Sequence, residues 1–408
     1  MQRGNDARDV GFLRYDLIIV GGGLVGAGLA VALRHSGLHI ALVDARLPSN
    51  NDPRLFALNA GSCQFLENLM LWPQLNQYAS PIHQVHVSHQ GRFGAVRLKN
   101  EEVNLPALGN VIPAHYIESA LNESLATLPN CDIYRPAKLM QLSQQENTAR
   151  LTISTEEGEK ILQSSIVIGA DGTESTVRTQ LNIRTDVFDY DQSAIVTRIN
   201  LKRTHHHIAY ERFNQHGAIA MLPLKGEECA MIWTADNAII SQLMELSDAA
   251  FLEKLQFEFG HRLGKLQAIQ KRHMFPLRMV RAEKTVDQCV MLLGNSAHTL
   301  HPIAAQGFNL ALYEVAALAE GIMKKIVSQQ PFNTEDLQKI CAQTQKQQAA
   351  SIGVSHRLSQ WVSKSSILSG LAVQLGMIAL DVSTPIKKRF IQGMLGRTGR
   401  VPGLLLKS

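Results

Sequence analysis

The stretch that decides the fold is YDLIIVGGGLVGAGLAVALRHSGLHIALVD, residues 15–44. Its apolar residues 17–20 predict a short buried strand, and residues 39–43 predict a second one. The segment between them carries small residues on one side, which is typical of a helix packed closely on a sheet. A strand, a helix and a second strand in this order indicate a Rossmann-like α/β fold.

Three glycines between the first strand and the helix fit the pattern G-x-G-x-x-G: Gly21, Gly23 and Gly26. They permit a tight turn, the close approach of a pyrophosphate and the contact between helix and strand. Asp44 follows the second strand, where a carboxylate would accept hydrogen bonds from ribose hydroxyls. We therefore predict a dinucleotide site here. Its predicted lining also includes Leu24, Val25 and Ala45.

A second stretch, VMLLGNSAHTLHPIAAQGFNLALYEVAALA, covers residues 290–319. Its apolar start predicts a strand, which ends at Gly294 and Asn295. An apolar helical pattern begins at Gly307, after a loop that contains Pro302. Alone, this could be an ordinary connection in an α/β domain. The glycine-rich stretch near the start of the chain makes a ligand site the better interpretation.

The start of this predicted helix suits an electron-rich ligand. The N–H groups of Gly307, Phe308 and Asn309 would have no partner within the helix, and the positive end of the helix dipole lies behind them. Gly307 has no Cβ, so a flat ligand could lie against the backbone. We place the reacting part of the ligand at these residues and at Pro302.

The chain is expected to fold into two intimately packed domains, one of them discontinuous. A third predicted strand, residues 165–169, runs into Asp171 and Gly172. Ligands of such sheets bind beyond the carboxyl ends of the strands, so the three glycine-bearing segments should converge on one extended ligand. The predicted division is a loose tail at residues 1–14, a nucleotide domain at 15–80, 110–186 and 286–330, a sheet-rich substrate domain at 81–109 and 187–285, and a helical C-terminal region with a basic tail at 331–408.

Local patterns predict further elements. Helices are expected at residues 57–70, 113–128 and 248–259, and a hairpin at residues 85–98. The histidines at 205–207 are expected on a strand, where alternating faces would keep them from sharing one metal ion.

Composition is that of a globular protein, with 45% hydrophobic and 18% charged residues among 408. The five cysteines are dispersed and have no metal-ligand spacing, which predicts free thiols in a reducing compartment and no metal site. Residues 1–14 lack the apolar core of a signal peptide. The sequence contains no run of about eighteen apolar residues, so no membrane-spanning helix is predicted.

The charge distribution suggests contact with a membrane surface. Residues 367–380 are apolar but too short to span a bilayer, and no acidic residue follows Asp381. The basic residues after this point are Lys387, Lys388, Arg389, Arg397, Arg400 and Lys407. One interpretation is a cytoplasmic protein bound peripherally to the inner, anionic face of the membrane; the other is a helix docked on the core with a solvated basic end. Nucleic-acid binding is not expected, because exposed aromatics do not alternate with the basic residues.

Three motifs together resemble the flavoprotein aromatic hydroxylases, the single-component FAD monooxygenases. These are the glycine fingerprint, the segment GADG at 169–172 with Ser175 and Arg178, and the segment from Gly294 to Pro302. Within this family, HPIAAQGFNL at residues 301–310 is similar to the signature of the ubiquinone-biosynthesis hydroxylases, and the pattern is most similar to the 2-polyprenyl-6-methoxyphenol hydroxylases.

The resemblance implies a chemistry and a set of contacts. FAD would extend between the first and third motifs, with Asp171 and Gly172 near FAD and the nicotinamide, and with Arg54 at the pyrophosphate. The alternatives are that Asp171 only holds its loop and that Arg54 is an ordinary surface arginine. NAD(P)H would reduce FAD, O2 would add at flavin C4a, and the resulting hydroperoxide would hydroxylate a polyprenylated phenol. Other ubiquinone-biosynthesis proteins are possible partners. The sheet segments at 218–222 and 231–233 would keep water from the flavin, although the more common role of such residues is to form core.

This sequence departs from the family pattern at four positions. Asn295 replaces an aspartate, although its amide oxygen can still accept a hydrogen bond from a ribityl hydroxyl. Ala305, Ala311 and Glu314 replace Gly, Gly and Asp. His298 and His301 are lone loop histidines, for which a structural role is the more common one, and the sequence indicates no general base for the phenol.

Two other functions stay open at this point. One is a flavin reductase or dehydrogenase of the same fold that inserts no oxygen. The other is a flavin-loaded scaffold subunit of the biosynthetic assembly, which the substitutions at Ala305 and Ala311 would favour. The sequence does not distinguish NADH from NADPH, because it contains no second nucleotide fingerprint.

Overall fold

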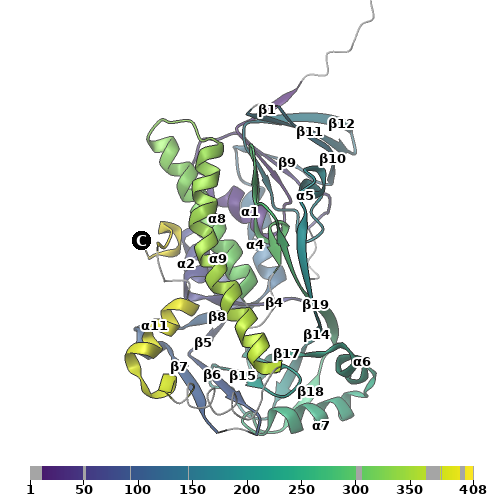
Figure 1. Ribbon diagram of the computed structural model, residues 1–408, viewed down its shortest axis with the longest axis vertical. Coiled ribbons are helices and arrows are strands. Elements are labelled where there is room, and N and C mark those ends of the chain that lie inside the picture. The colour runs from purple at the N-terminus through teal and green to yellow at the C-terminus, as the bar shows by residue number, and fades with distance from the viewer. Residues whose placement is uncertain are drawn as a thin grey trace, which may run out of the picture.

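The computed structural model describes residues 12–48, 52–91, 93–145, 147–299, 306–363, 377, 379–395 and 400–407. Figure 1 shows two parts joined by the long strands β14 (Thr185–Leu201) and β19 (His273–Ala282). The upper part contains a six-stranded sheet and most of the helices, and the lower part is built on a nine-stranded sheet. The α/β class and the helical C-terminal region are as predicted.

The six-stranded sheet has the strand order β20-β21-β13-β2-β3-β9. The strands β21, β13, β2, β3 and β9 pair in parallel, and β20 is antiparallel to β21. The three strands that precede the glycine-bearing segments are therefore neighbours, so these segments leave the sheet at one edge. The bounds are β2 Leu17–Val20, β3 Ile40–Val43, β9 Cys131–Tyr134, β13 Val167–Gly169, β20 Val286–Asp287 and β21 Val290–Leu292.

Different layers cover the two faces of this sheet, because its strands are apolar on both sides. Leu17 and Ile19 pack under helices, whereas Ile18 and Val20 pack toward a second, four-stranded sheet. The helices on the first face include α1 Leu24–Ala32, α2 Ala60–Asn68, α4 Ala114–Leu125 and α8 Gln306–Val327. The four-stranded sheet contains β1 Leu13–Tyr15, β10 Ala137–Gln145, β11 Thr148–Thr155 and β12 Gly158–Ser164, and the short helix α5 Thr176–Gln180 packs on β10.

The nine-stranded sheet has the order β22-β19-β14-β17-β16-β15-β6-β7, and β18 pairs with β14. One face packs under α6 Asn237–Glu245 and α7 Asp248–Phe259, and the opposite face looks toward α8. The remaining strands are β6 Gln84–His89, β7 Ala95–Lys99, β15 Ile208–Phe213, β16 Ala218–Pro223, β17 Glu228–Asp236, β18 Leu266–Ile269 and β22 His298–Thr299. The predicted hairpin at residues 85–98 is confirmed as the antiparallel pair β6 and β7.

A three-stranded sheet between the two parts corrects one prediction. Residues 55–59 do not begin the helix predicted at 57–70, because they form strand β4 (Leu55–Asn59) against β8 (Gly109–Pro113). The helix begins at Ala60, where the Asn59 side chain accepts a hydrogen bond from Ser62 N. The third strand is β5 Ser80–Ile82, and short helical turns follow at α3 Trp72–Leu75, η1 Asn76–Tyr78 and η2 Asn100–Val103.

The histidines at 205–207 correct a second prediction. They lie in a turn rather than on a strand, and His206 and His207 have φ values of 50° and 57°. Among the described residues, no three His, Cys, Asp or Glu side chains lie together as a metal site requires.

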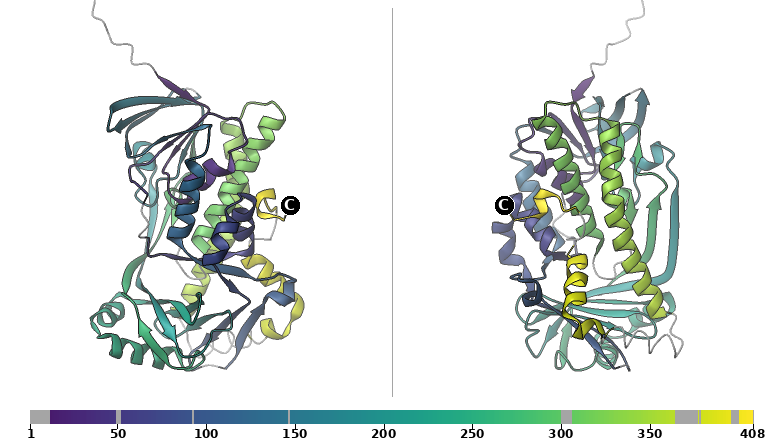
Figure 2. Two further views of the ribbon diagram at one scale, coloured as in Figure 1. Left: turned by 180° about the vertical axis from the view of Figure 1, so that it is seen from behind. Right: turned by 60° about the vertical axis from the view of Figure 1, so that its left-hand side comes forward.

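The C-terminal region is mainly helical. Helix α9 (Thr334–Ser363) lies beside α8 along the long axis of the molecule (Figure 2). Pro385 occupies the first turn of α11 (Thr384–Met394), so it starts a helix rather than breaking one. The apolar segment at 367–380 falls almost entirely outside the described residues, as does Arg397. Within the described part of the chain, no helix has the length and apolarity that crossing a bilayer requires.

Candidate active site

A cavity of about 1710 Å³ connects the two parts of the molecule. A pocket for one drug-sized ligand typically measures about 300–1,000 Å³, so this cavity is large enough for more than one such ligand. Its walls come from the ends of β2, β3 and β13, the start of α8, the inner face of the nine-stranded sheet and α11. Of the residues predicted to bind or react, Gly21, Gly23, Leu24, Val25, Asp44, Ala45, Arg54, Asp171, Gly172, Asn295, Gly307, Phe308 and Asn309 line it. Gly26 and Gly294 support this lining from behind, and Pro302 lies outside the described residues, as do His301 and Ala305.

The three glycines of the fingerprint differ in the space around them. A Cβ added to Gly26 would lie 1.8 Å from the carbonyl oxygen of Gly21, and one on Gly21 would lie 2.4 Å from Ala170. A Cβ on Gly23 would meet no atom within 4 Å. The absence of a Cβ at Gly21 and Gly26 therefore allows close packing against neighbouring main-chain atoms, whereas Gly23 leaves space for a ligand.

Asp44 is held in place at the end of β3. Its Oδ2 accepts hydrogen bonds from Gly22 N at 3.0 Å and from Arg135 Nη2 at 3.4 Å, and its Oδ1 accepts one from Arg46 N at 3.1 Å. The Arg135 side chain, which is 9% exposed, also donates to Gly22 O at 2.7 Å. Arg135 was not predicted from the sequence, because it is far from this loop along the chain and belongs to no motif.

Asp171 has mainly a structural role. Its Oδ1 accepts a hydrogen bond from Ser175 Oγ at 2.6 Å, and its Oδ2 accepts one from Val177 N at 3.1 Å, so the carboxylate fixes the start of α5. Arg178 then donates to Ser296 O at 2.9 Å, which ties this segment to the third motif. Gly172, with φ of 85° and no atom within 4 Å of an added Cβ, is the open position of this segment.

A buried ion pair supports the Gly294 turn. Gly294 has φ of 61° and donates its N–H to Glu314 Oε2 at 3.1 Å. The other oxygen of Glu314 lies 2.5 Å from His298 Nε2, and both side chains are almost fully buried. Burial alone would lower the pKa of His298, but the adjacent Glu314 carboxylate raises it above its usual value. Asn295, next in the chain, is exposed to the cavity.

We expect Glu314→Gln to lower the free energy of unfolding at pH 6 by roughly 1.5–3 kcal/mol, because Gly294 N–H and His298 lose a charged acceptor. Since the folded-state pKa of His298 is raised, the pair stabilises fully below the unfolded-state pKa of about 6.5 and loses this effect as pH rises through the folded-state value. The difference in free energy of unfolding between the variant and wild type should therefore be smaller at pH 9 than at pH 6. Urea unfolding at both pH values measures it.

The matched control is Glu335→Gln, which removes an exposed ion pair with Lys339 on α9. It should change stability by less than about 0.5 kcal/mol. Equal urea midpoints for Glu314→Gln and wild type at both pH values would show that the buried pair does not support the turn.

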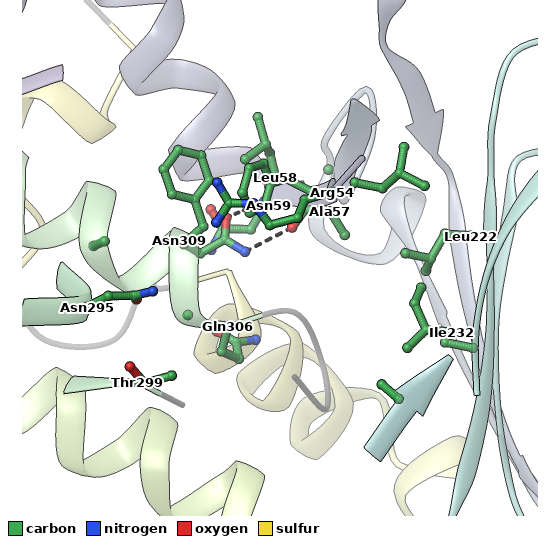
Figure 3. Close-up of a pocket in the computed structure, with 18 of the residues that line it drawn as sticks. Arg54, Ala57, Leu58, Asn59, Leu222, Ile232, Asn295, Thr299, Gln306 and Asn309 are labelled. Carbon is green, nitrogen blue, oxygen red and sulfur yellow. Dashed lines mark hydrogen bonds between the residues drawn. The ribbon is translucent and has the colours of Figure 1, made fainter. Parts of the chain in front are cut away.

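The start of α8 is open at Gly307, where an added Cβ would meet no atom within 4 Å. The Phe308 ring lies 4.4 Å from that of Phe56. The Asn309 side chain accepts a hydrogen bond from Asn59 N and donates one to Ala57 O, both at 2.9 Å (Figure 3). Asn309 thus fastens β4 to α8, a role that the sequence did not predict.

Arg54 lines the cavity but already has an acidic partner. Its guanidinium binds Asp52, with Nη2 and Oδ2 at 2.6 Å, and lies 5.5 Å from the centre of the Phe56 ring. Burial raises the pKa of Asp52, but the hydrogen bonds from Arg54 lower it by more, so the pKa lies below its usual value. A pyrophosphate would therefore meet Arg54 as part of an ion pair.

The strand segments 218–222 and 231–233, predicted as a wall, contribute side chains both to the cavity and to the core, because side chains alternate along a strand. Ala218, Ala220 and Leu222 of β16 and Ile232 of β17 line the cavity. Figure 3 shows Leu222 and Ile232 across the cavity from Gln306 and Asn309. The intervening residues are buried under α6 and α7: Ile219, Met221, Met231 and Trp233.

Comparisons with known proteins agree with this geometry. The profile of a protein family described as "FAD binding domain" matches residues 14–330. The uncharacterised protein slr1300 of Synechocystis is 30% identical over 96% of this chain and 95% of its own length. The ubiquinone hydroxylase UbiL of Rhodospirillum rubrum is 28% identical over 96% of this chain and 92% of its own. The 3-demethoxyubiquinol 3-hydroxylase of Escherichia coli is 27% identical over 75% and 78%.

Among solved structures, p-nitrophenol 4-monooxygenase PnpA from Pseudomonas putida superposes with a TM-score of 0.80, covering 96% of this chain and 100% of that one. The two sequences are 16% identical, so this likeness concerns the fold.

Proposed function

The chain belongs to the family of proteins with this FAD binding domain, and on that premise we propose that it is an FAD-dependent monooxygenase that hydroxylates the ring of a polyprenylated phenol in ubiquinone biosynthesis. The relatives named above include two hydroxylases of ubiquinone or its precursor. The observation that carries the proposal is the continuous cavity, which joins the dinucleotide motif at one end to an apolar wall at the other. NAD(P)H is the reductant and O2 the oxidant.

The residues of the cavity fit FAD. Gly23 and Gly307 leave open space at the two ends of the expected binding path, and Asp44, Arg54 and Asn295 supply polar groups beside it. In this arrangement Asp44 would accept a hydrogen bond from the ribose, Gly23 and Arg54 would lie at the pyrophosphate, and Asn295 would accept a hydrogen bond from the ribityl chain. Bound FAD, once reduced, supplies the reaction with O2 that transfers one oxygen atom to the ring.

The protein contributes electrostatics and exclusion of water. The start of α8 at Gly307 and Phe308 would place main-chain N–H groups and the positive end of the helix dipole near negative charge on the ring system. The alkyl side chains of β16 and β17 form the opposite wall and keep water from the reacting groups.

The test uses the purified chain reconstituted with FAD and given detergent-solubilised 2-polyprenyl-6-methoxyphenol, NAD(P)H and oxygen-18-labelled O2. We expect a product that carries one labelled oxygen. NAD(P)H oxidation without labelled product would indicate an oxidoreductase that inserts no oxygen. Bound flavin that NAD(P)H fails to reduce would indicate a scaffold subunit.

The proposal includes peripheral binding to the anionic inner face of the membrane, through α11. Ile386 of α11 is 58% exposed, and Phe390 lies one turn further along the same side of this helix. Val382, just before α11, is 76% exposed. Ile386 and Phe390 also line the cavity, so a prenyl chain would enter it beside α11. The neighbouring Lys388 and Arg389 are exposed.

Lys387, which the sequence analysis grouped with the basic tail, is not available to lipid. It is buried and lies 3.0 Å from Glu102 and 3.2 Å from Asp381, so it fastens α11 to the core. We also propose other ubiquinone-biosynthesis proteins as partners.

Replacing Val382 and Ile386 together with glutamate should weaken binding to vesicles of anionic phospholipid at least tenfold, because two exposed apolar groups become charges. Co-sedimentation with vesicles measures this. Val327→Glu, at an equally exposed valine at the end of α8, is the matched control and should bind like wild type. Equal binding of the double variant and the control would refute α11 as the contact.

A further inference from the structure

The cavity-facing side of the nine-stranded sheet carries an acidic residue among apolar ones. Pairing across the strands places one row in register, from Val87 through Glu211, Ala220 and Ile232 to Val196. All five residues line the cavity, and four of them are alkyl. Glu211 is therefore the one carboxyl group in this row, and the titratable His89 on β6 lines the cavity two residues from Val87.

The neighbours of Glu211 on β15 confirm which way its side chain points. Tyr210 packs with its ring 5.7 Å from that of Phe259 on α7, and Arg212 donates to Glu258 O at 2.9 Å, also on α7. Since side chains alternate along a strand, Glu211 faces the opposite side, which is the cavity.

No hydrogen bond or ion pair to the Glu211 carboxyl group is formed by any residue that the structure describes. Asp44 and Asp171, in contrast, are occupied by main-chain N–H groups and polar side chains. Burial raises the pKa of Glu211 to about 7. An unpaired carboxylate on an apolar wall lowers stability unless a ligand satisfies it.

We propose that Glu211 is the catalytic base that accepts the phenolic proton of the aromatic substrate. The inference rests on the proposed hydroxylation and names the group that the sequence left unidentified. An ionised carboxylate among alkyl side chains orients a phenol by accepting its O–H, while the rest of the ring and its alkyl chain contact the apolar row.

The proton balance of the reaction is complete with this residue. As a ring carbon forms its new C–O bond, the phenolic O–H bond breaks, the proton passes to Glu211, and its electron pair enters the ring to give a dienone. That carbon then releases its hydrogen to water as a proton, and the C–H electron pair restores the aromatic ring. Glu211 returns its proton to the carbonyl oxygen. O2 is reduced by NAD(P)H through FAD, and its second oxygen atom leaves as water.

The deciding experiment compares a short-chain 2-prenyl-6-methoxyphenol with its O-methyl ether, which has no proton to donate. Binding to the oxidised, FAD-loaded chain is measured by calorimetry without NAD(P)H, so no turnover occurs. Wild type should prefer the phenol about tenfold above pH 8, as one hydrogen bond to a charged group allows. This preference should decline as pH falls through about 7, because Glu211 takes up a proton.

The variant Glu211→Gln keeps the size of the side chain but cannot take a proton. It should lose the preference for the phenol at every pH, lower kcat about tenfold and remove the rise of kcat near pH 7. Glu228→Gln, at the end of β17 away from the cavity lining, is the control and should behave as wild type.

A Glu211→Gln variant that retains the wild-type preference and pH profile would overturn the assignment. That result is distinct from failure of the proposed function, which would appear as wild-type enzyme that incorporates no labelled oxygen.

Discussion

Replacing Gly307 with valine should weaken FAD binding about 100-fold while leaving the fold intact. A Cβ added at this position would meet no atom of the described residues within 4 Å, so we expect the substitution to leave the fold intact. The new side chain would instead fill the space at the start of α8 where the flavin ring is expected to lie. Adding carbon atoms to a filled site typically costs about 1–3 kcal/mol, and the upper part of that range corresponds to a loss of affinity of about 100-fold.

Two measurements separate these effects. Titration of the flavin-free protein with FAD, followed by flavin fluorescence, gives the affinity, and thermal unfolding without FAD gives the stability. Gly393→Val, at an exposed glycine within α11, is the matched control for placing valine in a helix. Wild-type FAD affinity in Gly307→Val would mean that the ring lies elsewhere.

Replacing Gly26 with valine should destabilise the protein itself, by roughly 3 kcal/mol or more. Its Cβ would lie 1.8 Å from the Gly21 carbonyl oxygen and 3.0 Å from Ile19 Cγ2. Main-chain atoms of the turn after β2 cannot move away without separating α1 from the sheet. Overpacking of this kind exceeds the usual cost of about 1–3 kcal/mol, because no flexible side chain can yield.

Gly23→Ala is the informative comparison, because its Cβ would meet no atom within 4 Å. It should unfold in urea at a denaturant concentration close to that of wild type and yet bind FAD more weakly. Gly26→Val should show a lower midpoint even without FAD. If the Gly26 variant were as stable as Gly23→Ala, the close contact between α1 and β2 would not be needed for folding.

Elements with strong local signals were predicted well. Helix α7 occupies residues 248–259 as expected, since the Ser247 side chain caps its start and Gly260 ends it. The parallel arrangement of β2, β13 and β21 followed from apolar runs that end in glycine. The helix predicted at 57–70 was wrong in its first turn, because pairing with β8 takes residues 55–59 into a strand. Helix α6 was not predicted. It packs on the outer face of β14 and β17, and no local sequence pattern indicates that contact.

The sequence by itself determined the α/β fold, the FAD-binding family and which main-chain segments line the cavity. Glycine spacing and apolar runs are local features, and they express backbone requirements that do not depend on distant residues. Only the tertiary structure decided which side chains meet there: Arg135 at Asp44, Glu314 at Gly294 and Glu211 on the cavity wall. Each of these depends on the pairing or packing of segments far apart in the chain. The direction of a side chain within a cavity, and the desolvation it experiences there, arise only from that packing.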